Sequence, residues 1–157
     1  MTSANGHDLS RVVRAGLLTG ISDGLFSSIL SVAAYHSTVA RLFQGVASTV
    51  IGPAAFDGGM RTALLGVAMH FGVAFAWSAV FLVLVKRSAW IRATLGSRYG
   101  VAKVASLYGP FIWLVMSFVV IPLLTHRPPR ITVRWWVQLI GHAPFVGLPL
   151  VGSIRPR

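Results

Sequence analysis

The residues with the greatest chemical capacity in this sequence are one acid and two histidines that lie within apolar segments. The 157-residue chain has three carboxylates, and Asp23 lies in the middle of an apolar stretch from Val12 to Ala34. An ionisable side chain at membrane depth is energetically costly, so it usually faces a protein interior or a water-filled cavity. Asp23 is therefore the first candidate for a functional site.

Two histidines in other apolar segments lie at a similar depth. At 1.5 Å per residue, Asp23, His70 and His142 fall roughly 10–17 Å below the expected outer boundary of the membrane. Gln138 precedes His142 by one helical turn and shares its face. We expect Asp23, His70, His142 and Gln138 to form an inward-facing polar cluster.

This cluster has three interpretations. In the first, Asp23 accepts hydrogen bonds from His70, His142 or a serine and only supports the fold. In the second, Asp23 is part of a proton relay or ion path. In the third, His70 and His142 ligate a haem or a chlorophyll-type pigment axially. A zinc site needs three or four ligands in close geometry, and we predict no metal site.

Groupings typical of enzymes are lacking in the sequence. No Gly-x-Ser-x-Gly motif occurs, and Asp57-Gly58-Gly59 is not followed by the Lys-Ser/Thr of a phosphate-binding loop. There is no cysteine, which excludes disulfides and cysteine-ligated metals. We therefore predict a protein that is not an enzyme and has no resident cofactor, unless the two histidines bind a pigment or haem.

The elements that carry these residues are predicted to be transmembrane helices. The composition is 55% hydrophobic and only 11% charged, and the apolar runs exceed the roughly 18 residues that indicate a span. We predict one all-α membrane domain over residues 1–157, a four-helix bundle with spans at about 12–34, 62–85, 101–124 and 135–152. The apolar segment at about 42–55 is too short to cross, and we expect it to form an interfacial or re-entrant helix.

Small residues indicate where these helices approach one another. Gly16, Gly20 and Gly24 follow one another at four-residue spacing on the first span, and Gly66 shares a face with His70 on the second. Such small faces allow close helix contacts in membranes. We predict that these four glycines are helix-packing positions.

The charge of the chain indicates its orientation. The net charge is +11, but the basic residues lie at the ends of the apolar segments, where they suit anionic lipids rather than nucleic acid. Nine lie on the side of the termini and five on the other, which predicts cytoplasmic termini in a bacterial inner membrane. The first set is Arg11, Arg14, Lys86, Arg87, Arg92, Arg98, Lys103, Arg155 and Arg157, and the second is Arg41, Arg61, Arg127, Arg130 and Arg134.

Short blocks along most of the chain carry a resemblance to a known group. They are Gly20-Ile21-Ser22-Asp23, Gln44-Gly45-Val46-Ala47-Ser48, Ala55-Phe56-Asp57-Gly58-Gly59, Gly66, His70-Phe71, Tyr108-Gly109, Val115-Met116, Val120-Ile121-Pro122-Leu123, His142 and Val146-Gly147-Leu148-Pro149. In these blocks the chain resembles small bacterial inner-membrane proteins loosely labelled YagU-like. The resemblance supports the fold and implies no mechanism.

Three functions are compatible with these features. The first is a non-catalytic accessory, assembly or stabilising subunit of a larger membrane complex, with other membrane-protein subunits and the bilayer as partners. Its basis is the glycine series and the lack of catalytic groupings. The second is a small transporter or proton-conducting protein that uses Asp23 with His70 and His142. The third is a haem- or pigment-binding subunit.

Overall fold

The structure of this protein is a computed structural model that describes residues 2–155. These residues form helices and no strands. Four helical segments are long and apolar enough to cross a membrane, namely Gly6–Ala34, Gly59–Arg87, Gly100–Thr125 and Val133–Ile154. A shorter apolar helix, α2 (Val39–Ile51), lies between the first and second of them. The predicted all-α class with four membrane-length helices and one short helix is confirmed.

Three of these four membrane-length segments, called the spans below, are composite. The first is α1 (Thr2–Ile29) continued by a π-helical segment (Leu30–Ala34), and the second is the uninterrupted α3 (Gly59–Arg87). The third comprises α5 (Gly100–Val115), a π segment (Met116–Val120) and α6 (Ile121–Thr125). The fourth comprises α7 (Val133–His142), a π segment (Ala143–Gly147) and α8 (Leu148–Ile154).

Prolines account for two of the π-helical segments. Pro122 and Pro149 lie in the first turns of α6 and α8, directly after a π segment. Proline has no N–H to donate, and its ring clashes with the carbonyl group four residues earlier. A π turn accommodates this local break in the hydrogen-bond ladder. The third and fourth spans therefore continue through Pro122 and Pro149.

Hydroxyl side chains begin the shorter helices. Thr38 accepts a hydrogen bond from the Arg41 amide at 3.1 Å at the start of α2. Ser88 does the same for Ile91 at 3.2 Å and begins α4 (Ala89–Leu95). Helix α4 was not predicted from the sequence, because this seven-residue helix is specified by a cap and not by a long apolar run. At the end of α2, Gly52 adopts a φ of 72°, which turns the chain into a short 3-10 segment (Pro53–Phe56).

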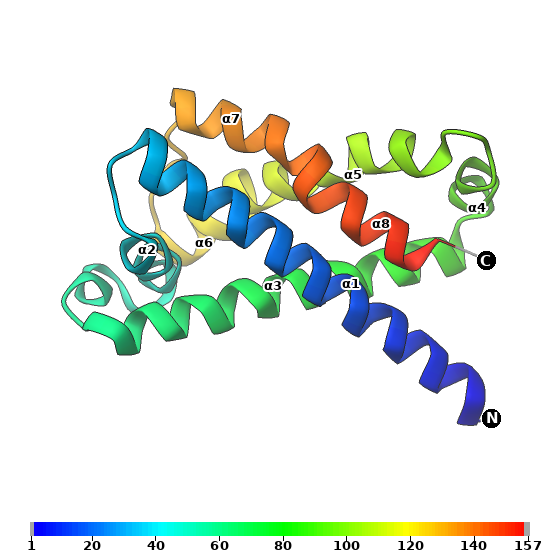
Figure 1. The fold of residues 1–157 in the computed structure, drawn as a ribbon, viewed down its shortest axis with the longest axis horizontal. Coiled ribbons are helices and arrows are strands. Elements are labelled where there is room, and N and C mark those ends of the chain that lie inside the picture. Colours follow the sequence, from blue (N-terminus) through cyan, green and yellow to red (C-terminus); the bar gives the residue numbers. More distant parts are fainter. Residues whose placement is uncertain (1, 156–157) are drawn as a thin grey trace.

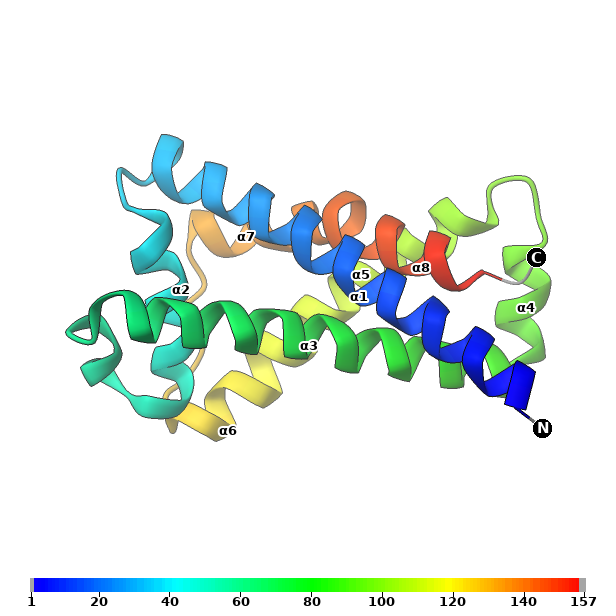
Figure 2. The ribbon, with the colours of Figure 1, turned by 60° about the horizontal axis from the view of Figure 1, so that its bottom comes forward.

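The fourth span lies against the other three. Helix α8 contacts α1, α3 and α5, and α7 contacts α1 and α5. In the most apolar part of the fourth span half of the residues are buried, whereas only 17–22% are buried in the most apolar part of each other span. The N-terminus, the C-terminus and α4 lie at one end of the bundle, and α2 and α6 lie at the other (Figures 1 and 2). We call the two ends of the bundle the terminal half and the α2 half.

The apolar core belongs mainly to the terminal half. Its most buried large side chains are Phe81 of α3 and Leu150, Val151 and Ile154 of α8, each at most 1% exposed. Ala15 of α1 is fully buried in the same cluster. The α2 half holds the polar side chains described next.

Candidate functional site

The first polar pair joins α1 to α3. The carboxylate Oδ2 of Asp23 lies 3.9 Å from Nδ1 of His70, and the two side chains are 17% and 16% exposed. The other ring nitrogen of His70, Nε2, lies 2.9 Å from the Gly20 carbonyl oxygen. Because a carbonyl oxygen can only accept, Nε2 carries a hydrogen and donates it. The nitrogen that can gain or lose a proton is therefore Nδ1, which faces Asp23.

Close contact between α1 and α3 makes this pair possible. A Cβ atom on Gly16 would lie 2.1 Å from Cδ1 of Phe75, and one on Gly20 would lie 2.6 Å from Cδ1 of Phe71. A Cβ on Gly24 would lie 3.4 Å from Nε2 of His70. Glycine at these positions lets the aromatic face of α3 reach the backbone of α1.

Helix α2 covers the same region. A Cβ on Gly66 would lie 1.8 Å from the backbone oxygen of Phe43, so α2 crosses α3 at backbone contact. The ring of Phe43 then lies edge-on to His70, with 5.7 Å between the ring centroids. Gln44 of α2 also donates to the Gly59 carbonyl at 3.0 Å. The imidazole of His70 is thus enclosed by α1, α2 and its own helix.

A second polar pair joins α1 to α7. Nε2 of Gln138 donates to Oγ of Ser27 at 3.2 Å. Nδ1 of His142 contacts the Gln138 carbonyl oxygen at 2.7 Å, and the His142 ring lies 4.8 Å from that of Trp113. Among residues 2–155, no ion pair or hydrogen bond connects this pair to Asp23 or His70. The four predicted residues thus form two pairs. Asp23 and His70 lie between α1 and α3, and Gln138 and His142 lie on α7, beside α1.

Several buried polar atoms have no hydrogen-bond partner among the described residues. They include Oδ1 of Asp23, Oε1 of Gln138 and Oγ1 of Thr19. Thr19 is 3% exposed and precedes Asp23 by one turn. Thr19 was not among the predicted site residues, although the four-residue spacing of Thr19, Asp23, Ser27 and Ser31 places them on one helix face. We call these four residues the polar stripe.

The two ends of the polar stripe differ. Ser31 lines a cavity of about 260 Å³ in the α2 half, together with Ser37, Arg41 and Arg134. One turn before Thr19, on the same face, the chain has Ala15, which is packed into the apolar core. The stripe therefore reaches a cavity at one end and stops at packed apolar side chains at the other.

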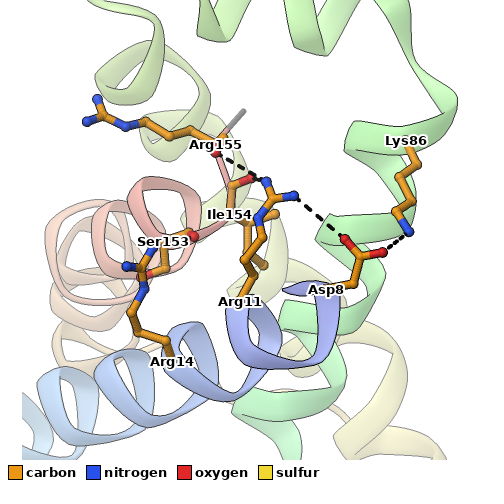
Figure 3. Close-up of polar contacts among 7 residues, drawn as sticks. All are labelled: Asp8, Arg11, Arg14, Lys86, Ser153, Ile154 and Arg155. Carbon is orange, nitrogen blue, oxygen red and sulfur yellow. Dashed lines mark hydrogen bonds and ion pairs between the residues drawn. The ribbon is translucent and has the colours of Figure 1, made fainter. Parts of the chain in front are cut away.

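A charged cluster at the opposite end was also missed by the sequence analysis. Figure 3 shows Asp8 of α1 between Lys86 of α3, which donates to it, and Arg11, whose guanidinium lies 3.7 Å away. One carboxylate thus bridges the first two spans. We call the contacts of Asp8, Arg11, Arg14 and Lys86 the terminal clamp.

The two arginines of the terminal clamp also hold the fourth span. Arg11 donates to the carbonyl groups of Ile154 and Arg155, and Arg14 donates to that of Ser153 at 2.8 Å (Figure 3). Carbonyl groups at a helix C-terminus lack partners within the helix and carry partial negative charge. Cationic side chains therefore stabilise the end of α8.

The histidine geometry defines which ring nitrogens could reach a metal or a haem. Residues 6–155 contain no group of three or more His, Cys, Asp and Glu side chains that could hold a metal ion. The hydrogen bonds of the two histidines to backbone carbonyl groups leave Nδ1 of His70 and Nε2 of His142 as the ring nitrogens available to a ligand.

Comparison of the chain with protein-family models, with curated proteins and with solved structures finds no match. The resemblance to the YagU-like group stays a prediction. The site geometry is thus the basis for a functional proposal.

Proposed function

We propose that this protein is a multi-pass membrane protein in which the pair of Asp23 and His70 takes up and releases a proton, as part of a proton-conducting or proton-coupled transport role. The observation that carries the proposal is the environment of the Asp23 carboxylate. One oxygen is buried without a hydrogen-bond donor, and the other lies 3.9 Å from a titratable imidazole nitrogen. Intramembrane acids in such surroundings are typical of proton relays.

The chemistry of the pair suits reversible protonation. With Nε2–H directed to the Gly20 carbonyl, Nδ1 of His70 either carries a lone pair or a second proton. A distance of 3.9 Å is longer than a hydrogen bond. Either group can therefore exchange its proton without first breaking a strong bond to the other.

Access to the pair is asymmetric. Hydroxyl groups of the polar stripe continue from Asp23 toward the cavity of the α2 half, at Ser27 and Ser31. Toward the termini, Ala15 and Phe81 belong to packed apolar core. A carrier needs a state in which its site opens to one side only, and this arrangement supports such a state.

Proton flux into vesicles tests the proposal. The purified protein is reconstituted with a pH-sensitive dye inside, and a pH gradient is imposed. We expect Asp23→Asn to reduce flux to that of empty vesicles, because the amide cannot carry the proton. Asp57→Asn is the matched control, since Asp57 is exposed in the turn before α3. Wild-type flux in Asp23→Asn would contradict the proposal.

A second candidate is the non-catalytic subunit of a larger membrane complex. The glycine series of α1 no longer supports it, because Phe71 and Phe75 of α3 cover that face. A different feature does: Ala68, Gly72 and Ala76 form an exposed small-residue series on α3, and a Cβ on Gly72 would meet nothing within 4 Å. Such series favour close approach of another helix.

Extraction in mild detergent distinguishes the two candidates. A subunit should be recovered with a stoichiometric partner that Gly72→Leu displaces while Gly96→Leu, outside the spans, does not. Recovery of the wild type as a lone monomer from its native membrane would count against the subunit role and leave the proton role untouched.

The orientation is part of the proposal. Both termini are placed in the cytoplasm of a bacterial inner membrane, because the terminal half carries more basic residues than the α2 half. The described ones are Arg11, Arg14, Lys86, Arg87, Arg92, Arg98, Lys103 and Arg155, against Arg41, Arg61, Arg127, Arg130 and Arg134. Since the chain has no cysteine, a single cysteine introduced at Ser97 or Arg130 reports the exposed side to an impermeant thiol reagent. Labelling at Arg130 from the cytoplasm would reverse the assignment.

A further inference from the structure

The cavity of the α2 half is lined by cationic and hydroxyl groups. Its volume is about 260 Å³, far more than the ~10–15 Å³ that a cavity needs to hold one water. Arg41 of α2 and Arg134 of α7 contribute guanidinium groups, and Ser31 and Ser37 contribute hydroxyl groups. None of the lining residues is an acid. Leu42, Gly45 and Phe56 complete the lining of this open cavity, so both of its charged groups are cationic.

Aromatic rings support both guanidinium groups from one side. The Cζ atom of Arg41 lies 4.9 Å from the centroid of the Phe56 ring, and that of Arg134 lies 4.8 Å from the centroid of the Tyr35 ring. Stacking on a ring holds the plane of a guanidinium and leaves its N–H edge available. Neither arginine is in an ion pair within the described residues. Both forks are thus free to bind a ligand.

The backbone adds to the positive potential of the cavity. Arg41 lies in the first turn of α2, which begins at Val39, and Arg134 lies in the first turn of α7, which begins at Val133. Helix N-termini carry partial positive charge and favour anions. Ser37 is held beside Ser31 because its amide donates to the Ser31 carbonyl at 3.0 Å. The nearest acid in the sequence, Asp57, follows Phe56 but does not line the cavity.

We propose that this cavity binds a phosphate-type oxyanion, with Arg41 and Arg134 as bidentate donors and Ser31 and Ser37 as hydroxyl donors. The shared chemistry fits two sources, the phosphate of an anionic lipid headgroup and free inorganic phosphate. Planar guanidinium forks match the oxygen geometry of phosphate. The site lies outside the Asp23–His70 pair, and the proposal does not depend on a proton-coupled function.

Ligand-dependent thermal unfolding in detergent tests the site. The probes are dioctanoyl phosphatidylglycerol, inorganic phosphate, and dioctanoylglycerol as the lipid without phosphate. The test variant combines Arg41→Gln with Arg134→Gln, and the control combines Arg61→Gln with Arg130→Gln, two exposed arginines of the same half that do not line the cavity. Both variants lose the same charge, so the comparison separates a built site from general surface potential.

The expected result is a loss of affinity confined to the cavity pair. Removal of each charge-assisted contact should weaken phosphate-probe binding about tenfold, whereas the control pair should change it by less than about threefold. Arg41→Lys with Arg134→Lys keeps the charge but not the fork, and it should retain only part of the affinity. Helix content and elution volume of each variant check that it is folded.

Each arm assigns or rejects the source. Binding of phosphatidylglycerol but not of inorganic phosphate identifies a lipid-headgroup site, and competition by inorganic phosphate identifies a site for a soluble oxyanion. The proposal is overturned if the wild type binds neither probe, if dioctanoylglycerol binds equally well, or if the control pair loses as much affinity as the cavity pair.

Discussion

The two halves of the bundle treat their polar groups in opposite ways. In the terminal half, Asp8 contacts both Lys86 and Arg11, and Arg14 donates to the last turn of the fourth span (Figure 3). In the α2 half, buried oxygens of Asp23 and Gln138 have no hydrogen-bond partner among the described residues. One half uses its polar groups to join helices, and the other keeps some of them uncommitted.

This difference suggests that the terminal half stabilises the fold and that the α2 half holds the functional polar groups. A buried polar group without a partner destabilises a fold, and it is retained more readily where it binds something. The terminal half also holds the apolar core, with Phe81, Leu150 and Ile154 at most 1% exposed. We therefore expect truncation of a core side chain in the terminal half to cost the most stability, and changes to the Asp23–His70 pair or the cavity of the α2 half to alter flux or binding as well. The following predictions test this division, from the largest effect to the smallest.

The largest loss of stability is expected from Phe81→Ala. Phe81 is 1% exposed and lies 4.7 Å, centroid to centroid, from the Tyr108 ring. Truncation of a buried Phe leaves a cavity and costs about 3–5 kcal/mol. Reversible unfolding in mixed micelles measures it. Phe118→Ala in the α2 half is the control, because Phe118 is 45% exposed and should lose only about 1 kcal/mol, the value of one aromatic pair. Equal losses would contradict a core confined to the terminal half.

The Asp23–His70 pair should show a smaller loss that depends on both residues. His70→Ala removes the partner of a carboxylate, and a charged acid stranded in a span costs on the order of 2–3 kcal/mol. We therefore expect His70→Ala to destabilise the bundle more than the double variant with Asp23→Asn, which removes the stranded charge.

Thermal unfolding of the wild type, the two single variants and the double variant measures the interaction between Asp23 and His70. Interhelical hydrogen bonds in membranes average only about 0.6 kcal/mol, so a coupling well above that value indicates charge. Strictly additive losses would show that the 3.9 Å approach of Asp23 and His70 carries no interaction.

Gly66→Ala should cost about 1–3 kcal/mol, the range for an overpacked contact. The added Cβ would lie 1.8 Å from the Phe43 carbonyl oxygen, so α2 must move away from α3. Gly72→Ala on the outer face of the same helix meets nothing within 4 Å and should be neutral or stabilising by up to about 1 kcal/mol. If the two substitutions have equal effects on unfolding, α2 is not fixed at backbone contact.

The positions of the long helices could be predicted from the sequence, but which helices pack against one another could not. Four long apolar runs and one short run predict the elements because a bilayer accepts only segments of the right length with internal hydrogen bonds. Helix α1 extends to Thr2, beyond the predicted start of the span at residue 12, because a helix satisfies its own backbone outside the apolar layer as well. The seven-residue α4 carries no such signal.

Less of the candidate site could be predicted from the sequence. Depth alone placed Asp23 and His70 at one level, but which helices adjoin depends on contacts such as Gly20 with Phe71 and Gly66 with Phe43. Thr19 was missed because a lone threonine is common in a span, and its burial is visible only in three dimensions. The cavity of Arg41 and Arg134 brings together residues of two distant helices that no local pattern links.

The smallest effect is expected from the terminal clamp. Asp8 interacts with Lys86 and Arg11 at the surface of the bundle, where salt screens ion pairs and side-chain ordering offsets much of their attraction. Asp8→Asn should therefore lower the unfolding temperature slightly at low salt and leave it unchanged in 1 M salt. The decrease in unfolding temperature caused by Arg14→Gln should persist at high salt, because Arg14 donates to the carbonyl group of the buried Ser153 and not to an acid. Salt-insensitive loss in Asp8→Asn would place that carboxylate among the buried, paired groups and would make the terminal half depend on charge as much as on its apolar core.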